Sequence, residues 1–284
     1  STDHNPRYGL IDPYGGGVNA VVEAMRNVAA VGAMPHALSD CLCFGNPEKP
    51  HQMWEFVESV RGVSDACHAI TLKDNPNHAT PIIAGNVSFY NESKNGAIPP
   101  SPIVSCLGRL KDVNKTVPAH FQNNDSVLLM IGERKDELGG SVYYSLHDEF
   151  GANIPKPNLE EVKNQIFALT DCIDDGLVLS CHDISDGGVA SALAEMTFGN
   201  GIGCDVKIES GLTSDKILFS ETGGFILEVS PENMDEIKSL FLNVGLNVFE
   251  IGSTGGESIE MNGVVNLSVK ETNEAWTNGL RENL

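Results

Sequence analysis

The sequence predicts an α+β fold made of two mixed segments. Apolar residues recur at helical spacing in several stretches, and short apolar runs bounded by Gly, Pro and Asn lie between those stretches. This alternation of strand and helix occurs twice along the 284 residues. At roughly 150 residues per domain, the length indicates about two domains. Apolar residues make up 41% of the chain and charged residues 20%, which is typical of globular proteins.

Residues 1–115 form the first predicted domain and residues 125–284 the second. The stretch 111–124 is polar, contains Pro118 and lacks periodicity, so it indicates a linker. The elements predicted in the first domain are a strand over 7–11, a helix from the turn at 12–17 to Gly32, a strand over 36–44, a helix from His51 with Met53, Phe56, Val57, Val60 and Cys67 on its apolar side, a surface insertion over 71–80, and strands over 81–90 and 103–110.

The second domain repeats the mixed pattern. Its predicted elements are a strand over 126–131, helices from Gly140 and from Asn158, a strand over 177–182, a helix over 188–198, a strand over 225–229, a helix over 232–244, and strand pairs near Glu250 and Val269.

Charge and hydropathy restrict the partners. The chain has 39 acidic and 18 basic residues, a formal charge of -21, which repels nucleic acid and anionic lipid. We therefore expect no nucleic acid and no membrane as partner. No apolar run approaches the roughly 20 residues that cross a bilayer, and the first residues do not have the pattern of a secretory signal, so a cytoplasmic location is expected. A phosphorylated ligand must be held locally, by backbone amides, a few cations or Mg²⁺.

The seven cysteines include no C-x-x-C pair, as is typical of reduced cytosolic thiols. Cys41 and Cys43 are candidates for two metal ligands. No second pair completes such a site, so plain packing is the favoured interpretation.

Three segments combine glycine, carboxylate and amide groups. Asp40 lies inside an apolar strand, where an unpaired carboxylate costs several kcal/mol, so it requires a cation or strong donors. Metal or nucleotide binding and the capping of a nearby turn are both open. In the second segment, strand alternation puts Asn86 and Ser88 on one side, and Gly85 leaves room for close approach. These two residues suit Mg²⁺ and phosphate, or are simply solvated.

The third segment, 180–188, joins a strand to a helix, where backbone amides can receive a phosphate. Asp183 and Asp186 are candidate metal ligands, although capping the helix is the favoured role for Asp186. His182 has no evident nucleophile partner, which favours a structural role. The turn 219–224 is a weaker glycine-containing candidate. The phosphate-loop, dinucleotide and nucleophile-elbow signatures are absent from the sequence.

Together these motifs resemble one family. The resemblance spans about residues 11–268 and rests on the order of the segments IDPY at 11–14, EAMRN at 23–27, DCLCFGNP at 40–47, GNVS at 85–88, HDISDGG at 182–188 and FSE at 219–221. The chain resembles the C-terminal half of phosphoribosylformylglycinamidine synthase, in its large synthetase subunit. Cys43 departs from the motif, which usually has Asn there, and the segment around Asn75 lengthens the gap before Gly85.

The resemblance implies the fold of aminoimidazole ribonucleotide synthetase, in which an N-terminal α+β domain pairs through its sheet into a β-barrel and an α/β domain follows. It implies ATP and Mg²⁺ as cofactors. Asp40 and Gly85 fall at ATP-contacting positions, Asn86 at a magnesium position and Ser88 at a substrate position. Asp183 and Ser185 match positions that serve metal and nucleotide in some members.

The implied reaction phosphorylates the amide oxygen of formylglycinamide ribonucleotide with ATP, and ammonia then displaces phosphate to give the amidine. The catalytic histidine of the family belongs to the N-terminal half, so no catalytic residue is assigned here. Expected partners are that half, a glutamine amidotransferase subunit and the small-molecule substrate. The isolated chain is expected to be an inactive homodimer through about residues 7–110. Alternatives are a stand-alone ATP-dependent kinase or synthetase of the same superfold and a non-catalytic nucleotide-binding module.

Overall fold

The computed structural model describes residues 1–279. Its first part contains β1 (Thr2–Asp3), α1 (Pro6–Ile11), α2 (Pro13–Ala30), β2 (Met34–Cys43), α3 (Pro50–Ala69), β3 (Thr71–Leu72), β4 (Asn75–Ala79), β5 (Ile82–Ser88), β6 (Glu92–Ser93), β7 (Gly96–Ala97) and β8 (Ser101–Arg109).

Its second part contains η1 (Val113–Lys115), β9 (Val127–Ile131), α4 (Val142–Leu146), α5 (Leu159–Asp174), β10 (Val178–Ile184), α6 (Gly188–Phe198), β11 (Cys204–Val206), α7 (Ser214–Phe219), β12 (Gly224–Val229), η2 (Pro231–Asn233), α8 (Met234–Asn243), β13 (Val248–Thr254), β14 (Ser258–Met261), β15 (Val265–Ser268) and α9 (Val269–Asn278). The α+β class is confirmed. No helix among residues 1–279 is both long and apolar enough to cross a bilayer.

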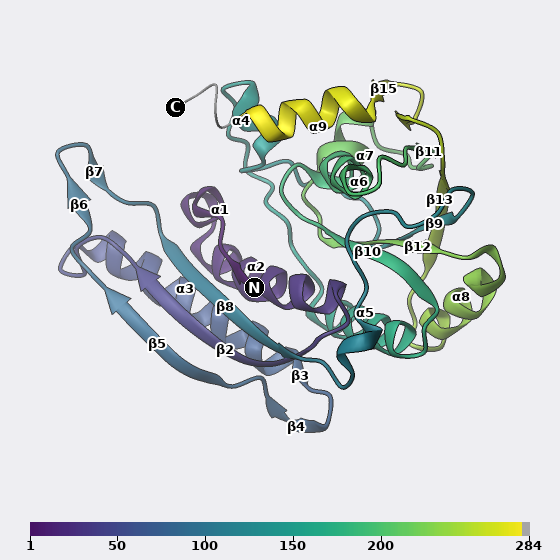
Figure 1. The fold of residues 1–284 in the computed structure, drawn as a ribbon. Coiled ribbons are helices and arrows are strands. Elements are labelled where there is room, and N and C mark those ends of the chain that lie inside the picture. The colour runs from purple at the N-terminus through teal and green to yellow at the C-terminus, as the bar shows by residue number, and fades with distance from the viewer. Residues whose placement is uncertain (280–284) are drawn as a thin grey trace.

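The first part is a four-stranded sheet in the order β1-β8-β2-β5, with β2 parallel to β5 and antiparallel to β8. Helices α2 and α3 cover one face of this sheet (Figure 1). Leu38, Val104 and Cys106 point into the core on that side. Because side chains alternate along a strand, their neighbours Ser39, Cys41 and Ser105 point to the opposite side. We call that side the open face.

Helices α2 and α3 pack closely through small residues. A Cβ on Gly17 would collide with the backbone of Ser59, and one on Gly62 with the backbone of Tyr14. The buried side of α3 is therefore Ser59, Gly62, Val63, Ala66 and Cys67. The apolar side predicted for this helix is wrong in part, since Met53, Val57 and Val60 are exposed. Close backbone approach selects the small residues over the large ones.

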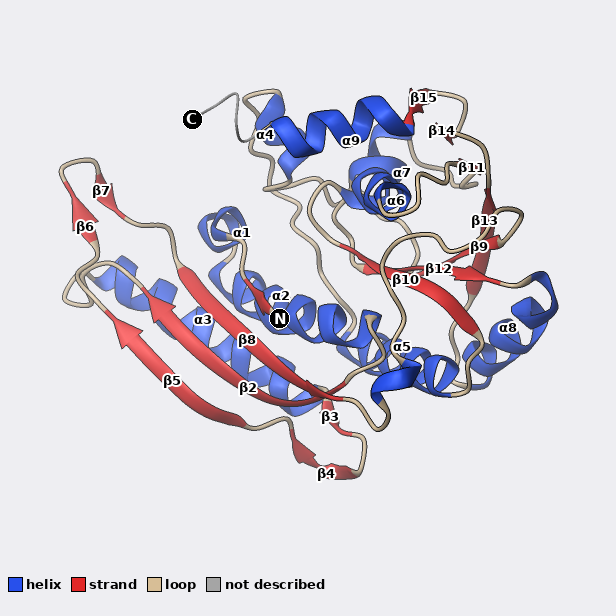
Figure 2. Cartoon of the chain, in the orientation of Figure 1, coloured by secondary structure: helices blue, strands red, loops and turns tan. Residues whose placement is uncertain are grey.

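The second part is a seven-stranded sheet in the order β10-β12-β9-β13-β11-β14-β15. Helices lie on both of its sides, α5 and α8 on one and α6, α7 and α9 on the other (Figure 2). Alternate residues of β9 pack into the two hydrophobic cores, one on each side of the sheet. Leu129 and Ile131 belong to the core that includes α2, α5 and α8, and Leu128 and Met130 to the core under α6.

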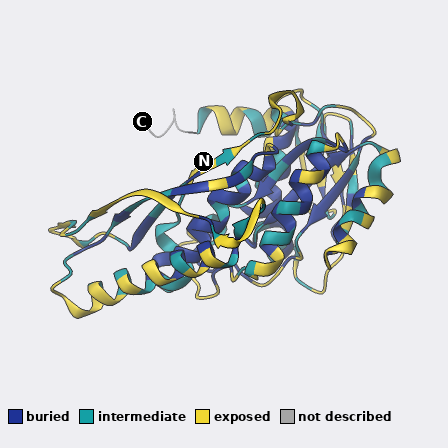
Figure 3. Ribbon diagram, turned by 90° about the horizontal axis from the view of Figure 1, so that it is seen from below, coloured by how far each residue is buried: buried dark blue, intermediate teal, exposed yellow. Residues whose placement is uncertain are grey.

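The larger core joins both parts of the chain, because α2 packs against α5 and β10 as well as against its own sheet. Buried residues concentrate there, while the far end of the first sheet is largely exposed (Figure 3). The stretch 111–124 is not a free linker, since the Phe121 ring is fully buried in the second core. The domain limits 1–115 and 125–284 remain predictions.

One predicted strand is wrong. Residues 7–11 belong to helix α1, because the Asn5 side chain caps the helix by accepting from the Arg7 amide and Pro6 occupies its first turn. The strand pair predicted near Val269 is confirmed by β14 and β15, which pair up to Ser268. Helix α9, which was not predicted, begins at Val269, where Ser268 and Glu271 form a capping box. The other predicted strands and helices are confirmed to within a few residues, and the insertion at 71–80 is the hairpin of β3 and β4. Helix α7 and strand β11 were not predicted.

Candidate nucleotide and metal sites

Asp40 and Gly85 are direct neighbours on β2 and β5. A Cβ built on Gly85 would lie 2.5 Å from Asp40 Oδ1, so the absence of a side chain makes room for this carboxylate. Burial raises the pKa of Asp40, and a hydrogen bond from the Asn86 backbone amide opposes that rise. Among residues 1–279, the carboxylate therefore has one backbone donor and no ion pair, which leaves acceptor capacity for a ligand.

A cavity of about 240 Å³ lies beside Asp40 on the helix side of the sheet. Its walls are mostly apolar, and its lining residues are Asp40, Leu42, Val60, Val63, Ser64, Cys67, His68, Ala79, Thr80 and Ile82. An apolar cavity with a single carboxylate acceptor can hold a planar ring that carries an N–H donor.

Asn86 and Ser88 lie on the open face, opposite to Asp40. The Asn86 Nδ2 is 3.9 Å from Cys41 Sγ, and Ser88 Oγ is 3.3 Å from Asn91 Oδ1. The four residues expected around one nucleotide thus share two adjacent strands, but their side chains divide between two faces. Strand β5 is the edge of this sheet, so a ligand that runs along the edge can contact both faces.

A second site lies where β1, α2 and the loop after β10 meet. A cavity of about 370 Å³ is lined there by Thr2, Asp3, His4, Asn5, Glu23, Asn27, Ile103, Ser185 and Asp186. Burial, and then repulsion from Asp186, raises the pKa of Asp3 to about 6. Burial and the neighbouring Asp3 raise the pKa of Glu23 well above its usual value. Like charges confined in this way favour a bound cation.

Asp183 lies close to the carboxylates of this cavity and contributes to the raised pKa values of Asp3 and Glu23. The amide of Asn27 is 3.0 and 3.1 Å from its carboxylate oxygens. Burial raises the pKa of Asp183, but hydrogen bonding and the charge of His182 outweigh burial and hold it below the usual value. No three His, Cys, Asp or Glu side chains within residues 1–279 converge tightly enough to ligate one metal ion. An ion would therefore also use amide, hydroxyl or water oxygens.

The loop 185–188 differs from the prediction. Gly187, in the left-handed region at φ 75°, is the N-cap of α6, and no side chain caps this helix, so the capping role favoured for Asp186 is wrong. The Gly187 amide instead donates to Glu221 Oε1 at 3.0 Å. Glu221 Oε2 also accepts from the Tyr8 hydroxyl at 2.5 Å. Glu221 therefore fixes this loop relative to α1.

His182 is held by two carboxylates. Its Nε2 is 3.0 Å from Glu195 Oε2 and its Nδ1 is 3.3 Å from Asp183 Oδ1. Burial lowers the pKa of His182, but hydrogen bonds to Asp183 and Glu195 more than offset burial and raise it to about 10. A histidine that stays protonated is a structural cation and a poor general base.

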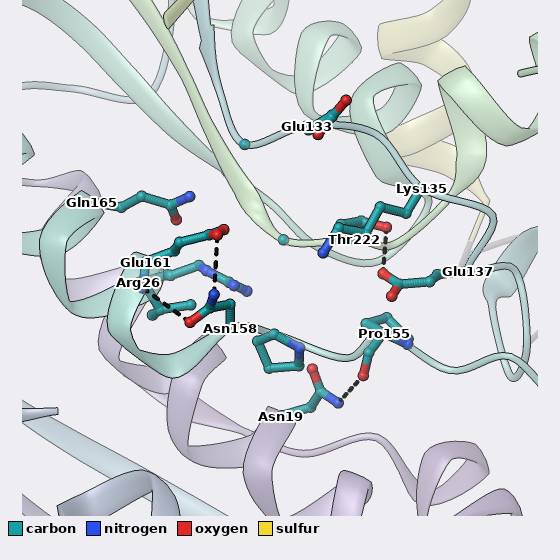
Figure 4. A pocket seen from close by; sticks show the side chains of 14 residues that line it. Asn19, Arg26, Glu133, Lys135, Glu137, Pro155, Asn158, Glu161, Gln165 and Thr222 are labelled. Carbon is teal, nitrogen blue, oxygen red and sulfur yellow. Dashed lines mark hydrogen bonds between the residues drawn. The ribbon is translucent and has the colours of Figure 1, made fainter. Parts of the chain in front are cut away.

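Arg26 forms a third candidate site that the sequence did not reveal. It is 5% exposed, it has no hydrogen bond or ion pair in the described structure, and its Nε is buried without a partner. Figure 4 shows the pocket of about 120 Å³ that it lines between α2, α5 and the loops before β12 and after β9. Lys135, Asn158, Gln165 and Thr222 also line this pocket, and Gln165 Oε1 is buried without a partner.

A buried Nε without a partner is costly, so an anion that reached Arg26 would be stabilised there. The carboxylates of Glu133, Glu137 and Glu161 also line the pocket and oppose such an anion, so the pocket has charges of both signs. The signal available in the sequence was one cation on the apolar side of a helix, between Val22 and Ala29. Burial lowers the pKa of Arg26, and the negative charge of Glu23, three residues earlier on α2, opposes that shift. Helix α2 therefore contributes an acidic side chain, Glu23, to the cavity lined by Asp3 and Asp186 and a basic side chain, Arg26, to the Arg26 pocket.

Comparison with known families gives two matches in chain order. The model of the AIR synthase related protein N-terminal domain matches residues 1–110, and that of the C-terminal domain matches residues 123–262. Among curated proteins, the chain is 45% identical over 289 residues to the phosphoribosylformylglycinamidine synthase subunit PurL of Methanothrix thermoacetophila, covering 99% of this chain and 38% of that protein. The PurL subunit of Moorella thermoacetica is 40% identical, with 97% and 37% covered. The chain thus spans about two-fifths of these relatives.

Solved structures share the fold. Thermotoga maritima PurL complexed with FGAR superposes with a TM-score of 0.77 at 18% identity, over 95% of this chain and 44% of that one. The same protein complexed with ATP gives a TM-score of 0.72 at 18% identity, over 96% and 43%. The hydrogenase maturation protein HypE in complex with ATP gives 0.67 at 15% identity, over 95% and 83%.

Proposed function

The chain belongs to the AIR synthase related family, with both of its domains in order, and we propose that it is the C-terminal half of a PurL-type synthetase. In the reaction proposed for the complete enzyme, ATP activates the amide oxygen of formylglycinamide ribonucleotide and ammonia replaces the phosphate. The chain would act as part of an ATP-dependent C–N ligase, and alone it would be inactive.

The observation that carries this proposal is the pocket at Asp40. Its apolar walls suit the faces of an adenine ring, and the Asp40 carboxylate suits the exocyclic amine of that ring. Gly85 keeps the carboxylate in place by leaving its space free. Relatives of this fold have been solved with ATP and with ADP. We assign Asp40 and Gly85 to nucleotide binding on these grounds.

Mg²⁺ would be held at two places. Asn86 offers an amide oxygen on the open face of the β5 edge, and Asp183 offers a carboxylate beside the cavity that Asp3, Glu23 and Ser185 line. In that cavity the mutual repulsion of the carboxylates supports a bound cation, and Ser185 can donate to a nucleotide phosphate. When bound, Mg²⁺ would neutralise phosphate charge during transfer.

The substrate would use two groups of this chain. Ser88 faces the open side of the sheet, where a second half would complete the site. In the Arg26 pocket, Arg26 and Lys135 would contact a phosphate or carboxylate group, against the opposing charge of the three glutamates in the lining. No residue of this chain is proposed as the catalytic acid or base.

The expected partners follow from the exposed sheet. The described residues leave the open face and the β5 edge uncovered. The unpaired backbone groups of an edge strand can form hydrogen bonds with a strand of another chain. We propose that an N-terminal half covers this side in the complete enzyme, and that a second copy does so when the chain is isolated. A glutamine amidotransferase subunit would supply ammonia. A cytoplasmic location, without nucleic acid or membrane as partner, accompanies this function.

Calorimetry with ADP and Mg²⁺ tests the nucleotide site. We expect binding by the isolated chain and a loss of at least about tenfold in affinity in Asp40→Asn, because the variant replaces an acceptor by a donor at the ring. Asp65→Asn, which changes an exposed carboxylate of α3, is the matched control. Equal affinity in both variants would refute the assignment, and turnover with formylglycinamide ribonucleotide by the chain alone would favour a stand-alone synthetase.

A further inference from the structure

Cys41 and Cys43 differ from the other cysteines in their surroundings. Cys67, Cys106, Cys172, Cys181 and Cys204 are buried members of the two cores. Cys41 and Cys43 are half-buried and belong to neither core. Neither thiol therefore fills space in a hydrophobic core, which is the role that the sequence favoured for them.

The two thiols form a pair on the open face. They are two residues apart on β2, so strand alternation turns both to the same side, and their sulfurs are 3.8 Å apart. Burial raises the pKa of Cys43, and the neighbouring thiol adds to this rise. A metal ion that bound both sulfurs would displace their protons.

The spacing matches the geometry of a bound metal ion. With sulfur–metal bonds of roughly 2.3 Å, two sulfurs 3.8 Å apart subtend about 110° at the ion, which is the tetrahedral angle. A disulfide would instead require the sulfurs to approach to about 2.05 Å, between residues whose Cα atoms are held apart by the extended strand. The existing geometry suits a shared cation better than a covalent bond.

We propose that Cys41 and Cys43 bind one thiophilic d¹⁰ cation of the zinc class as a bidentate pair. The two protons leave to solvent as the sulfurs coordinate. Asn86, whose amide nitrogen is 3.9 Å from Cys41 Sγ, lies beside the pair but is not counted as a ligand of this cation. Water, or groups from the partner that covers the open face, would occupy the remaining positions. This proposal does not depend on the nucleotide function.

Cadmium titration of the reduced, metal-free chain tests the proposal. The probe is Cd²⁺, and the readout is its thiolate charge-transfer absorption, which binding to carboxylates does not produce. We expect one Cd²⁺ per chain with this absorption, and a loss of at least about tenfold in affinity in Cys43→Ser and in Cys43→Asn. The asparagine variant has the residue usual in this motif. Circular dichroism before titration verifies that each variant is folded.

The double variant Cys41→Ser/Cys43→Ser keeps the five buried cysteines and is the decisive control. Loss of the absorption in this variant supports the site. Its persistence would assign the metal to other thiols and overturn the proposal, as would absence of the absorption in the unaltered chain. ADP affinity, measured separately, reports on the nucleotide site alone, so failure of one proposal is distinguishable from failure of the other.

Discussion

Substitution of Gly85 by alanine tests the contact on which the nucleotide pocket depends. The φ angle of Gly85 lies outside the left-handed region, so alanine is allowed by the backbone. The new methyl group would meet Asp40 Oδ1 at 2.5 Å and Cγ at 3.0 Å. Asp40 must therefore turn away and give up its hydrogen bond from the Asn86 amide.

The magnitude follows from two opposing contributions. Glycine to alanine at a compatible strand position stabilises by about 0.4–1 kcal/mol through the unfolded chain. Overpacking against Asp40 together with the lost hydrogen bond costs about 1–3 kcal/mol. We expect the free energy of unfolding to fall by about 1–2 kcal/mol in Gly85→Ala. In the Asp40→Ala background the same substitution should be neutral or stabilising.

Urea denaturation of the four proteins in this cycle measures the coupling between the two residues. Gly211→Ala is the control, because a Cβ there meets nothing within 4 Å. ADP affinity should fall with Gly85→Ala and remain unchanged with Gly211→Ala. An equal loss of stability with and without the Asp40 carboxylate would refute the reasoning, since the cost would then arise elsewhere in the strand.

Three further predictions concern charge and assembly. Inorganic phosphate at one hundred times its Kd should stabilise the chain by about 2.7 kcal/mol in thermal unfolding. This effect should vanish in Arg26→Met and persist in Arg61→Met, which removes an exposed guanidinium; equal stabilisation of both variants would exclude the Arg26 pocket. The folded pKa of Asp3, raised from 3.8 to about 6, makes the protein most stable below pH 3.8 with respect to this group and lowers stability as pH rises through 6. We expect a loss of roughly 1–2 kcal/mol after solvent screening, removed by Asp3→Asn and reduced by Mg²⁺, and a flat pH profile in the unaltered protein would contradict it. Leu107, 60% exposed on β8, should support pairing of the open face, so Leu107→Asp should convert a dimer to a monomer in sedimentation, and a monomer before substitution would oppose the homodimer.

The sequence was sufficient for elements with clear periodicity. The apolar spacing of Val18, Val21, Met25 and Val28 predicted α2, and β9, α6 and β12 were also placed within a few residues. It failed where a local cap outweighed the apolar pattern, as at Asn5 before α1. It also gave no indication of helix α9, which Ser268 caps. It failed again for the buried side of α3, because that side depends on glycine contacts with another helix.

The candidate site was predictable only in its strand motifs. The pairing of Asp40 with Gly85 could be inferred from the motif order, but the division of Asp40 and Asn86 between two faces depends on the register of β2 with β5. Asp3 and Glu23 join Asp183 across more than 150 positions of sequence, which no local pattern records. The Arg26 site could not be predicted, because only the three-dimensional structure shows that its Nε is buried without a hydrogen-bond partner.

Helix α2 presents two groups whose charge is poorly compensated. Glu23 takes part in a group of confined carboxylates, while Arg26, one turn later, is a buried cation without a hydrogen bond among residues 1–279. A free anion would offset only the charge of Arg26, and a free cation only that of the carboxylates. A metal ion in the carboxylate cavity together with an anion in the Arg26 pocket would offset both. Such local neutralisation would be required for a chain with a formal charge of -21 to hold a phosphorylated ligand.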